Sequence, residues 1–112
     1  MPDQPSGPHW YSVRCIFQSP TETGSAYEER VTLWQTDDID AAIEQAEAEA
    51  AAYAAEVEAE YTGLAQAYWL VDQPSHGTEV FALVRDSSLD TDEYLDRFFD
   101  TGQERQGRWA ED

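Results

Sequence analysis

The stretch DDIDAAIEQAEAEAAAYAAEVEAEY, Asp37–Tyr61, carries the longest helical pattern in this chain. Its apolar side chains recur at alternating steps of four and three residues, which places them on one stripe of a helix and leaves the acids on the rest. This stripe consists of Ile39, Ile43, Ala46, Ala50, Tyr53 and Val57. An amphipathic helix needs an apolar surface to cover, so the flanking segments should supply a sheet.

Both ends of this helix are marked by residues that commonly begin or end helices. Thr36, Asp37 and Asp38 are candidate N-caps, because short polar side chains accept hydrogen bonds from the first backbone amides of a helix. Thr62 and Gly63 follow the last turn, where glycine is a common stop. A second, shorter helix is predicted at Thr91–Phe99, after the possible caps Ser87, Ser88 and Asp90.

Four other segments have the pattern of strands. Trp10–Phe17 and Tyr27–Trp34 alternate between two side-chain sets, with a loop containing Pro20 and Gly24 between them. Leu64–Val71 carries apolar residues in both of its alternating side-chain sets, as in a strand that is covered on both faces. Val80–Arg85 alternates again. The predicted order is therefore strand, strand, helix, strand, strand, helix.

This order predicts an α+β fold with a four-stranded antiparallel sheet. A helix separates the second and third strands, so these two should run parallel, and the fourth strand fits between them in the spatial order 1-2-4-3. Both helices would cover one face, as in a permuted ferredoxin-like arrangement, and the runner-up is a sheet that pairs across a dimer. We expect a flexible leader at residues 1–9, one domain at 10–102 and a tail at 103–112.

The charge balance is unusual, with 24 Asp and Glu against six Arg and no Lys, for a net charge of −18. Such a surface repels nucleic acids and anionic membranes, so neither is expected as a partner. The plainest interpretation of the acids is solubility, although they could attract a basic protein. The chain lacks a membrane-spanning run and a signal peptide, and with one cysteine, Cys15, it has no intrachain disulfide. We therefore expect a cytoplasmic protein.

The sheet face opposite the helices is the predicted binding surface. If Val31 and Leu33 point toward the helices, alternation turns the other side chains outward. Arg and aromatic residues are enriched at interface centres, and a large exposed apolar patch usually marks a partner site. The alternatives are that Trp109 of the tail covers this face, or that its arginines pair with Glu28, Glu29 or Glu79. The candidate interface is Trp10, Arg14, Arg30, Trp34, Trp69, Phe81 and Arg85.

Catalytic and cofactor chemistry have little support in the sequence. His9 and His76 lack the spacing of a metal site, and no phosphate-binding glycine loop or nucleophile elbow is present. Cys15 stands among apolar residues in the first strand, which is typical of a small core residue rather than an activated thiol. We expect no catalytic residues, no metal and no cofactor.

Five strings together carry a family resemblance. They are WYSVRCIFQ (10–18), YEERVTLWQ (27–35), GLAQAYWLVD (63–72), GTEVFALVRD (77–86) and YLDRFFDTGQERQ (94–106). From His9 to Gln106 they resemble a small bacterial family, widespread in actinobacteria, called domain of unknown function 4288. The resemblance implies a free-standing small cytoplasmic protein and assigns no catalytic residue, cofactor or partner.

The sequence therefore favours a non-enzymatic interaction module that dimerises or binds a protein partner through the open sheet face. One alternative is an acidic inhibitor or immunity-type protein that occupies the basic cleft of a toxin or nuclease. Another is a small-molecule-binding regulatory domain, which would need a pocket lined by convergent polar groups.

Overall fold

The computed structural model describes residues 8–106, which belong to two compact units that divide between Ala82 and Leu83. The first unit contains strands β1 (His9–Thr21), β2 (Gly24–Thr36) and β3 (Glu60–Leu70) and helix α1 (Ile39–Val57). The second contains helix α2 (Thr91–Phe98). The prediction that His9 belongs to the leader is wrong, since this residue begins β1. The rest of the leader up to Gly7 and the tail from Gly107, including Trp109, lie outside the described residues.

β1 and β2 form a long antiparallel hairpin that extends beyond the predicted strands. Thr21 pairs with Gly24, so only Glu22 and Thr23 form the turn. Gly24, the first residue after the turn, has a φ of 149°, a conformation that glycine adopts at no steric cost. The predicted loop at Gln18–Ser25 is therefore mostly strand.

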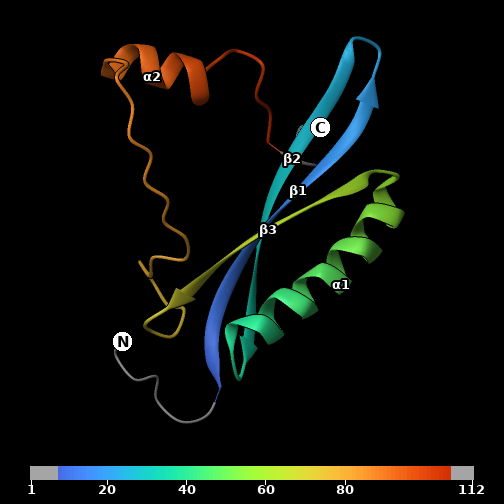
Figure 1. The fold of residues 1–112 in the computed structure, drawn as a ribbon, viewed down its shortest axis with the longest axis vertical. Coiled ribbons are helices and arrows are strands. Elements are labelled where there is room, and N and C mark those ends of the chain that lie inside the picture. The colour runs from blue at the N-terminus through green and yellow to red at the C-terminus, as the bar shows by residue number, and fades with distance from the viewer. Residues whose placement is uncertain (1–7, 107–112) are drawn as a thin grey trace. The chain divides into compact units, whose positions relative to one another are not determined.

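The sheet has three strands in the order β2-β1-β3, with both neighbours antiparallel to β1 (Figure 1). The prediction of a four-stranded 1-2-4-3 sheet is wrong. β2 and β3 do run in the same direction, but the strand between them is β1, because β3 pairs along Trp10–Gln18. The register shifts between Cys15 and Phe17, opposite Gly63, which has a φ of 93°. This glycine serves the sheet rather than the end of α1.

The predicted fourth strand is also wrong, since no part of Val80–Arg85 belongs to a strand. Residues 79–82, here called the strap, instead lie against the sheet face opposite α1. The Ser12 hydroxyl of β1 donates a hydrogen bond to the Val80 carbonyl, and the Phe81 ring contacts Tyr68 of β3. Phe81 turns toward the sheet while Val80 and Ala82 stay exposed, so the segment alternates like a strand without pairing as one, which explains the error.

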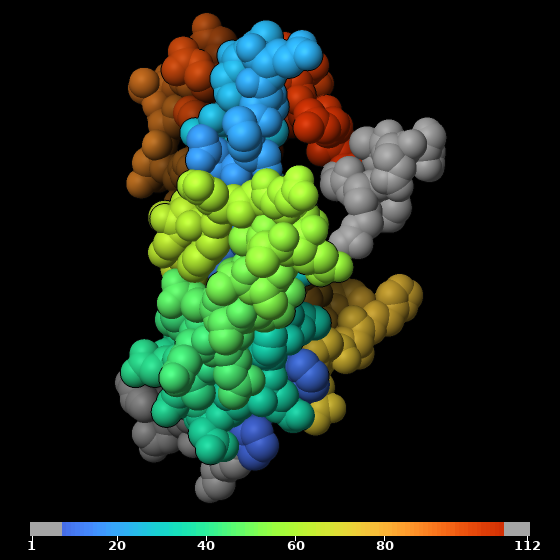
Figure 2. Space-filling model, turned by 90° about the vertical axis from the view of Figure 1, so that its right-hand side faces the viewer, coloured from blue at the N-terminus to red at the C-terminus, as the bar shows by residue number. Residues whose placement is uncertain are grey.

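Helix α1 covers the other face and contacts all three strands, as Figures 1 and 2 show. Its N-cap is Asp38, whose carboxylate accepts from the Ala41 amide at 2.8 Å. It ends at Glu58, which adopts the left-handed conformation (φ 60°), several residues before the predicted stop. The chain must leave the helix this early because β3 begins at Glu60.

The core lies between β1 and α1. Four consecutive inward side chains of β1 are buried, as alternation predicts for one strand face. The helix contributes alanines at every fourth position, and this alanine seam brings its backbone close to the sheet. Ile39 and Val57, expected in the stripe, are exposed instead. The core cluster comprises Tyr11, Val13, Cys15, Phe17, Ala42, Ala46, Ala50 and Ala54.

The hairpin register settles which side of β2 faces α1. Residues directly opposite one another in an antiparallel pair point to the same face, and Val13 lies opposite Thr32. Thr32 and its alternate neighbours therefore share the α1 face, while Val31 and Leu33 point away from it. The predicted orientation of β2 is inverted. The two-residue turn fixes this pairing, and a one-residue slip would have reversed it.

The second unit is described by itself. α2 begins with a capping box in which the Asp90 carboxylate accepts from the Glu93 amide at 2.9 Å and Glu93 accepts from the Asp90 amide at 3.3 Å. The prediction of this helix and of Asp90 as a cap is confirmed. Tyr94 packs against Phe98 with ring centroids 4.8 Å apart.

Candidate protein-interaction surface

The sheet face opposite α1, here called the open face, is built from one alternate set of side chains in each strand. β1 contributes Trp10, Ser12, Arg14 and Ile16, and β3 contributes Gln66, Tyr68 and Leu70 opposite them. The side chains of β2 on this face are exposed along its whole length. The open face thus has a covered half over β3 and an uncovered half over β2.

The uncovered half carries an apolar row, here called the β2 strip, formed by Ile16, Tyr27, Val31 and Leu33. Exposed fractions are 66% for Tyr27, 45% for Val31 and 41% for Leu33, and Ile16 beside them is half-buried. These are large apolar side chains in a chain that is otherwise rich in acids. Glu29, which pairs with Arg14, stands between Tyr27 and Val31 on the same face, and Ile16 lies opposite it in β1. Exposed apolar side chains gathered in this way are what protein contacts use.

Arg14 lies in the middle of the open face and its charge is well compensated. Its Nε and Nη2 donate to Oε1 of Gln66 at 3.0 and 2.5 Å, and its Nη1 contacts Glu29 at 3.2 Å. The guanidinium carbon lies 4.9 Å from the centre of the Phe81 ring. Because Arg14 pairs with Glu29, this part of the face adds no net charge.

Three predicted interface residues, Trp10, Arg14 and Phe81, therefore belong to the open face. Trp10 is half-buried there, between Gln35 of β2 and Leu70 of β3. Phe81 reaches the face from the strap rather than from a strand. The sequence alternation located these residues, although the reason given for Phe81 was wrong.

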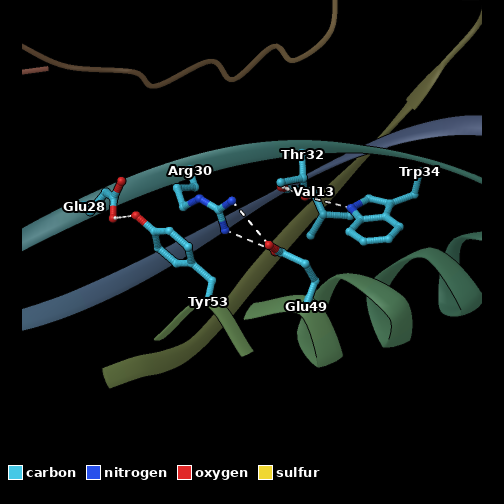
Figure 3. Close-up of polar contacts among 7 residues, drawn as sticks. All are labelled: Val13, Glu28, Arg30, Thr32, Trp34, Glu49 and Tyr53. Carbon is cyan, nitrogen blue, oxygen red and sulfur yellow. Dashed lines mark hydrogen bonds and ion pairs between the residues drawn. The ribbon is translucent and has the colours of Figure 1, made fainter. Parts of the chain in front are cut away.

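Arg30, Trp34 and Trp69 lie on the α1 face, so the prediction that they point away from the helix is wrong. Arg30 forms an ion pair with Glu49 of α1 at 3.1 Å and lies 3.6 Å from the centre of the Tyr53 ring (Figure 3). Trp34 and Trp69 pack against the buried core.

The neighbours of Arg30 join β2 to α1 by polar contacts (Figure 3). The Tyr53 hydroxyl donates to Glu28 at 2.7 Å. The Trp34 indole donates to the Thr32 hydroxyl at 2.7 Å, and that hydroxyl approaches the Val13 carbonyl at 3.5 Å. The Tyr53–Glu28 bond attaches the helix to the edge strand, whereas the two bonds of Thr32 lie within the sheet. Together with the ion pair to Glu49, these contacts give Arg30 a structural role.

Arg85, the remaining predicted interface residue, belongs to the second unit. Its Nη1 lies 3.4 Å from the Tyr94 hydroxyl, and its guanidinium carbon lies 5.8 Å from the centre of the Phe98 ring. These contacts hold Arg85 against α2.

The one cysteine is a core residue, which confirms that prediction. Burial raises the pKa of the Cys15 thiol, and burial together with a hydrogen bond to Glu47 raises the pKa of the nearby Tyr61 phenol. The Tyr61 hydroxyl donates to Glu47 at 2.6 Å. A protonated buried thiol is a weak nucleophile, so Cys15, Tyr61 and Glu47 contribute to packing and hydrogen bonding.

Residues 8–106 offer little support for a metal site or a small-molecule site. No cluster of three or more His, Cys, Asp or Glu side chains is positioned there to hold a metal ion. A hollow beside α2 is lined by Leu89, Glu93, Asp96 and Arg97, whose three charged side chains are exposed. A small-molecule site needs convergent, desolvated polar groups, which this hollow does not offer.

Comparisons of the chain with protein families, curated proteins and solved structures found no match. The resemblance to the domain of unknown function 4288 family therefore stays a prediction. Within the described part of the chain, neither helix is both long and apolar enough to cross a membrane.

Proposed function

We propose that this chain is a non-enzymatic protein-interaction module that self-associates through the β2 strip of its open face. The observation that carries the proposal is the exposure of Tyr27, Val31 and Leu33 in one row on a folded sheet. The free energy gained by removing apolar area from water, about 25 cal/mol per Å², favours covering such a row.

Charge restricts where a second copy of the chain can bind. Two molecules of net charge −18 repel each other over most of their surfaces. The outer side of α1 exposes Asp40, Glu44 and Glu56, whereas the β2 strip is apolar and the adjacent Arg14–Glu29 pair is neutral. A two-fold contact between strips would therefore bring the copies together where repulsion is weakest. Two sheets packed face to face in this way resemble a sandwich.

Sedimentation equilibrium of the full chain with paired double variants tests the proposal. The combined substitution Val31→Ser and Leu33→Ser should weaken self-association by at least about tenfold, because apolar contact area is lost. The control combines Val57→Ser with Ile39→Ser, whose exposed fractions of 43% and 40% match those of the first pair but which lie on α1.

The control should associate like the wild type, and circular dichroism should show that both variants keep the fold. A wild-type chain that stays strictly monomeric at millimolar concentration would contradict the proposal. Equal weakening in the two double variants would contradict it as well.

The acidic-inhibitor alternative has less support. Glu49 binds Arg30 and Glu47 accepts the Tyr61 hydroxyl, so two acids of α1 are engaged within the molecule. Those that stay exposed are spread along a helix without a defined recess. A salt-sensitive complex with a basic nuclease, retained by the Val31→Ser and Leu33→Ser double variant, would favour this alternative over ours.

A further inference from the structure

The β2 strip alone is small for a stable interface. Stable complexes bury roughly 800 Å² on each partner, supplied by some 20 to 30 residues. The strip has four apolar side chains, one of which is half-buried already. The rest of the open face could supply the missing area, but the strap (residues 79–82) lies on it.

The strap is attached by a few side-chain contacts. Ser12 donates to the Val80 carbonyl, and Tyr68 donates to the Glu79 carboxylate. Phe81 contacts the Tyr68 ring at 6.0 Å and the Arg14 guanidinium at 4.9 Å between centres. Among the described residues, no backbone-to-backbone hydrogen bond joins the strap to the sheet.

Most of the strap faces solvent as well. Glu79, Val80 and Ala82 are exposed, and only Phe81 is half-buried. Beneath it, Ser12 is fully buried and Tyr68 is half-buried. The strap therefore covers the β3 half of the open face while burying little of itself, which are the properties of a displaceable cover.

Sheet packing makes the strap and a second copy mutually exclusive over that half. Two sheets that pack face to face lie about 10 Å apart, a spacing filled by the side chains of the two faces. An additional chain segment on each face does not fit into this space. A second copy can cover the whole open face only after the strap has left it.

We propose that the strap is an autoinhibitory cover that competes with a second copy of the chain for the β3 half of the open face. This inference rests on the proposed self-association. With the strap in place, the copies meet through the β2 strip and bind weakly. Release of the strap exposes the face around Ser12 and Tyr68 and enlarges the contact.

Strap-release variants of the full chain test this competition by sedimentation equilibrium. Phe81→Ala removes the ring that contacts Arg14 and Tyr68, and Ser12→Ala removes the hydroxyl that holds the Val80 carbonyl. Each should lower the dissociation constant for self-association by about tenfold or more. The control is Val71→Ala, an exposed apolar residue of the same unit outside the strap, which should leave the constant unchanged.

The sign of the Phe81→Ala effect separates the two roles of this residue. A cover predicts tighter self-association, whereas a direct interface residue predicts weaker self-association. Unchanged or weaker association in both strap variants, with the fold intact by circular dichroism, overturns the inference.

Failure of the cover is distinguishable from failure of the proposed function. If the wild type associates through the β2 strip and the strap variants have the same dissociation constant, only the inference that the strap is a cover is wrong. If the strap variants associate tightly but Val31→Ser with Leu33→Ser has no effect, the strip is wrong and the cover stands. If neither the wild type nor any strap variant associates, both are wrong.

Discussion

Arg30 shows at the residue scale how a scarce cation is used. The chain has six arginines, and this one bridges β2 and α1 by contacts with Glu49 and the Tyr53 ring, with Phe17 5.8 Å from its guanidinium carbon. Arg is suited to this position because its planar group can stack on a ring and pair with a carboxylate at the same time. The residue that sequence reasoning placed in an interface thus contributes to stability.

Replacement of Arg30 by Ala should lower the free energy of unfolding by about 1–2 kcal/mol. The stacking on a partly desolvated ring contributes up to about 2 kcal/mol. The ion pair adds only about 0.2–1 kcal/mol, because its side chains are 23% and 36% exposed and solvent screens them. Urea unfolding measures the change.

Arg105→Ala, the same substitution at an exposed position, is the control and should change the free energy of unfolding by less than about 0.5 kcal/mol. If Arg30→Ala were equally harmless, the contacts with Tyr53 and Glu49 would not be stabilising.

Cys15 and Tyr61 make stability depend on alkaline pH. Their pKa values in the folded chain are raised above the ordinary 9.0 and 10.0, mainly by burial. Above pH 9 the unfolded chain therefore loses protons that the folded chain keeps. The unfolded state then binds fewer protons, so stability falls as pH rises.

Urea unfolding between pH 7 and 11 should show a free energy of unfolding that is level near pH 8 and declines above about pH 9. Tyr61→Phe should make the decline shallower, because one of the two groups no longer titrates. Tyr27→Phe, at an exposed tyrosine, is the control and should leave the slope unchanged. An identical slope in all three chains would show that Tyr61 is not responsible.

At the scale of elements, the alanine seam of α1 sets the distance between helix and sheet. Ala42, Ala46, Ala50 and Ala54 are four residues apart and buried, so α1 approaches β1 along their methyl groups. Sequence periodicity found the helix but centred its stripe on larger residues, of which Ile39 and Val57 are exposed. A pattern search weights isoleucine and valine over alanine, although the smallest side chains permit the closest packing.

Ala50→Leu should therefore destabilise the protein by about 1–3 kcal/mol, since three extra carbons have no space in a packed seam. Ala52→Leu, two positions along on the exposed side, is the control and should be close to neutral, because leucine is nearly as good a helix former as alanine. Thermal or urea unfolding compares the two. Similar stabilities would mean that α1 can move away from the sheet without cost.

At the scale of the whole molecule, net charge governs whether copies can meet. A charge of −18 on 112 residues opposes self-association at low ionic strength, where charges interact over tens of ångströms. Raising the salt concentration from 0.02 to 0.5 M shortens this range to a few ångströms. In the sedimentation experiments above, salt should therefore tighten self-association through the β2 strip, and a basic partner bound to the acids of α1 would show the reverse dependence.

The sequence by itself determined the local elements. The two helices, three of the four expected strands and the cap Asp90 follow from periodicity and capping chemistry, which depend on residues near one another in the chain. It also identified Trp10, Arg14 and Phe81 as residues of the open face. The expectation from charge that nucleic acids and anionic membranes are not partners stays a prediction.

Only the tertiary structure decided which face of β2 meets α1, which edge of β1 takes β3, and that residues 79–82 cross a face instead of joining an edge. A period of two defines two sides of a strand but does not say which is inside, and both sides of β2 carry large side chains. The turn at Glu22 and Thr23 resolved that choice by fixing the register, and with it the positions of Arg30 and Trp34 beneath the helix.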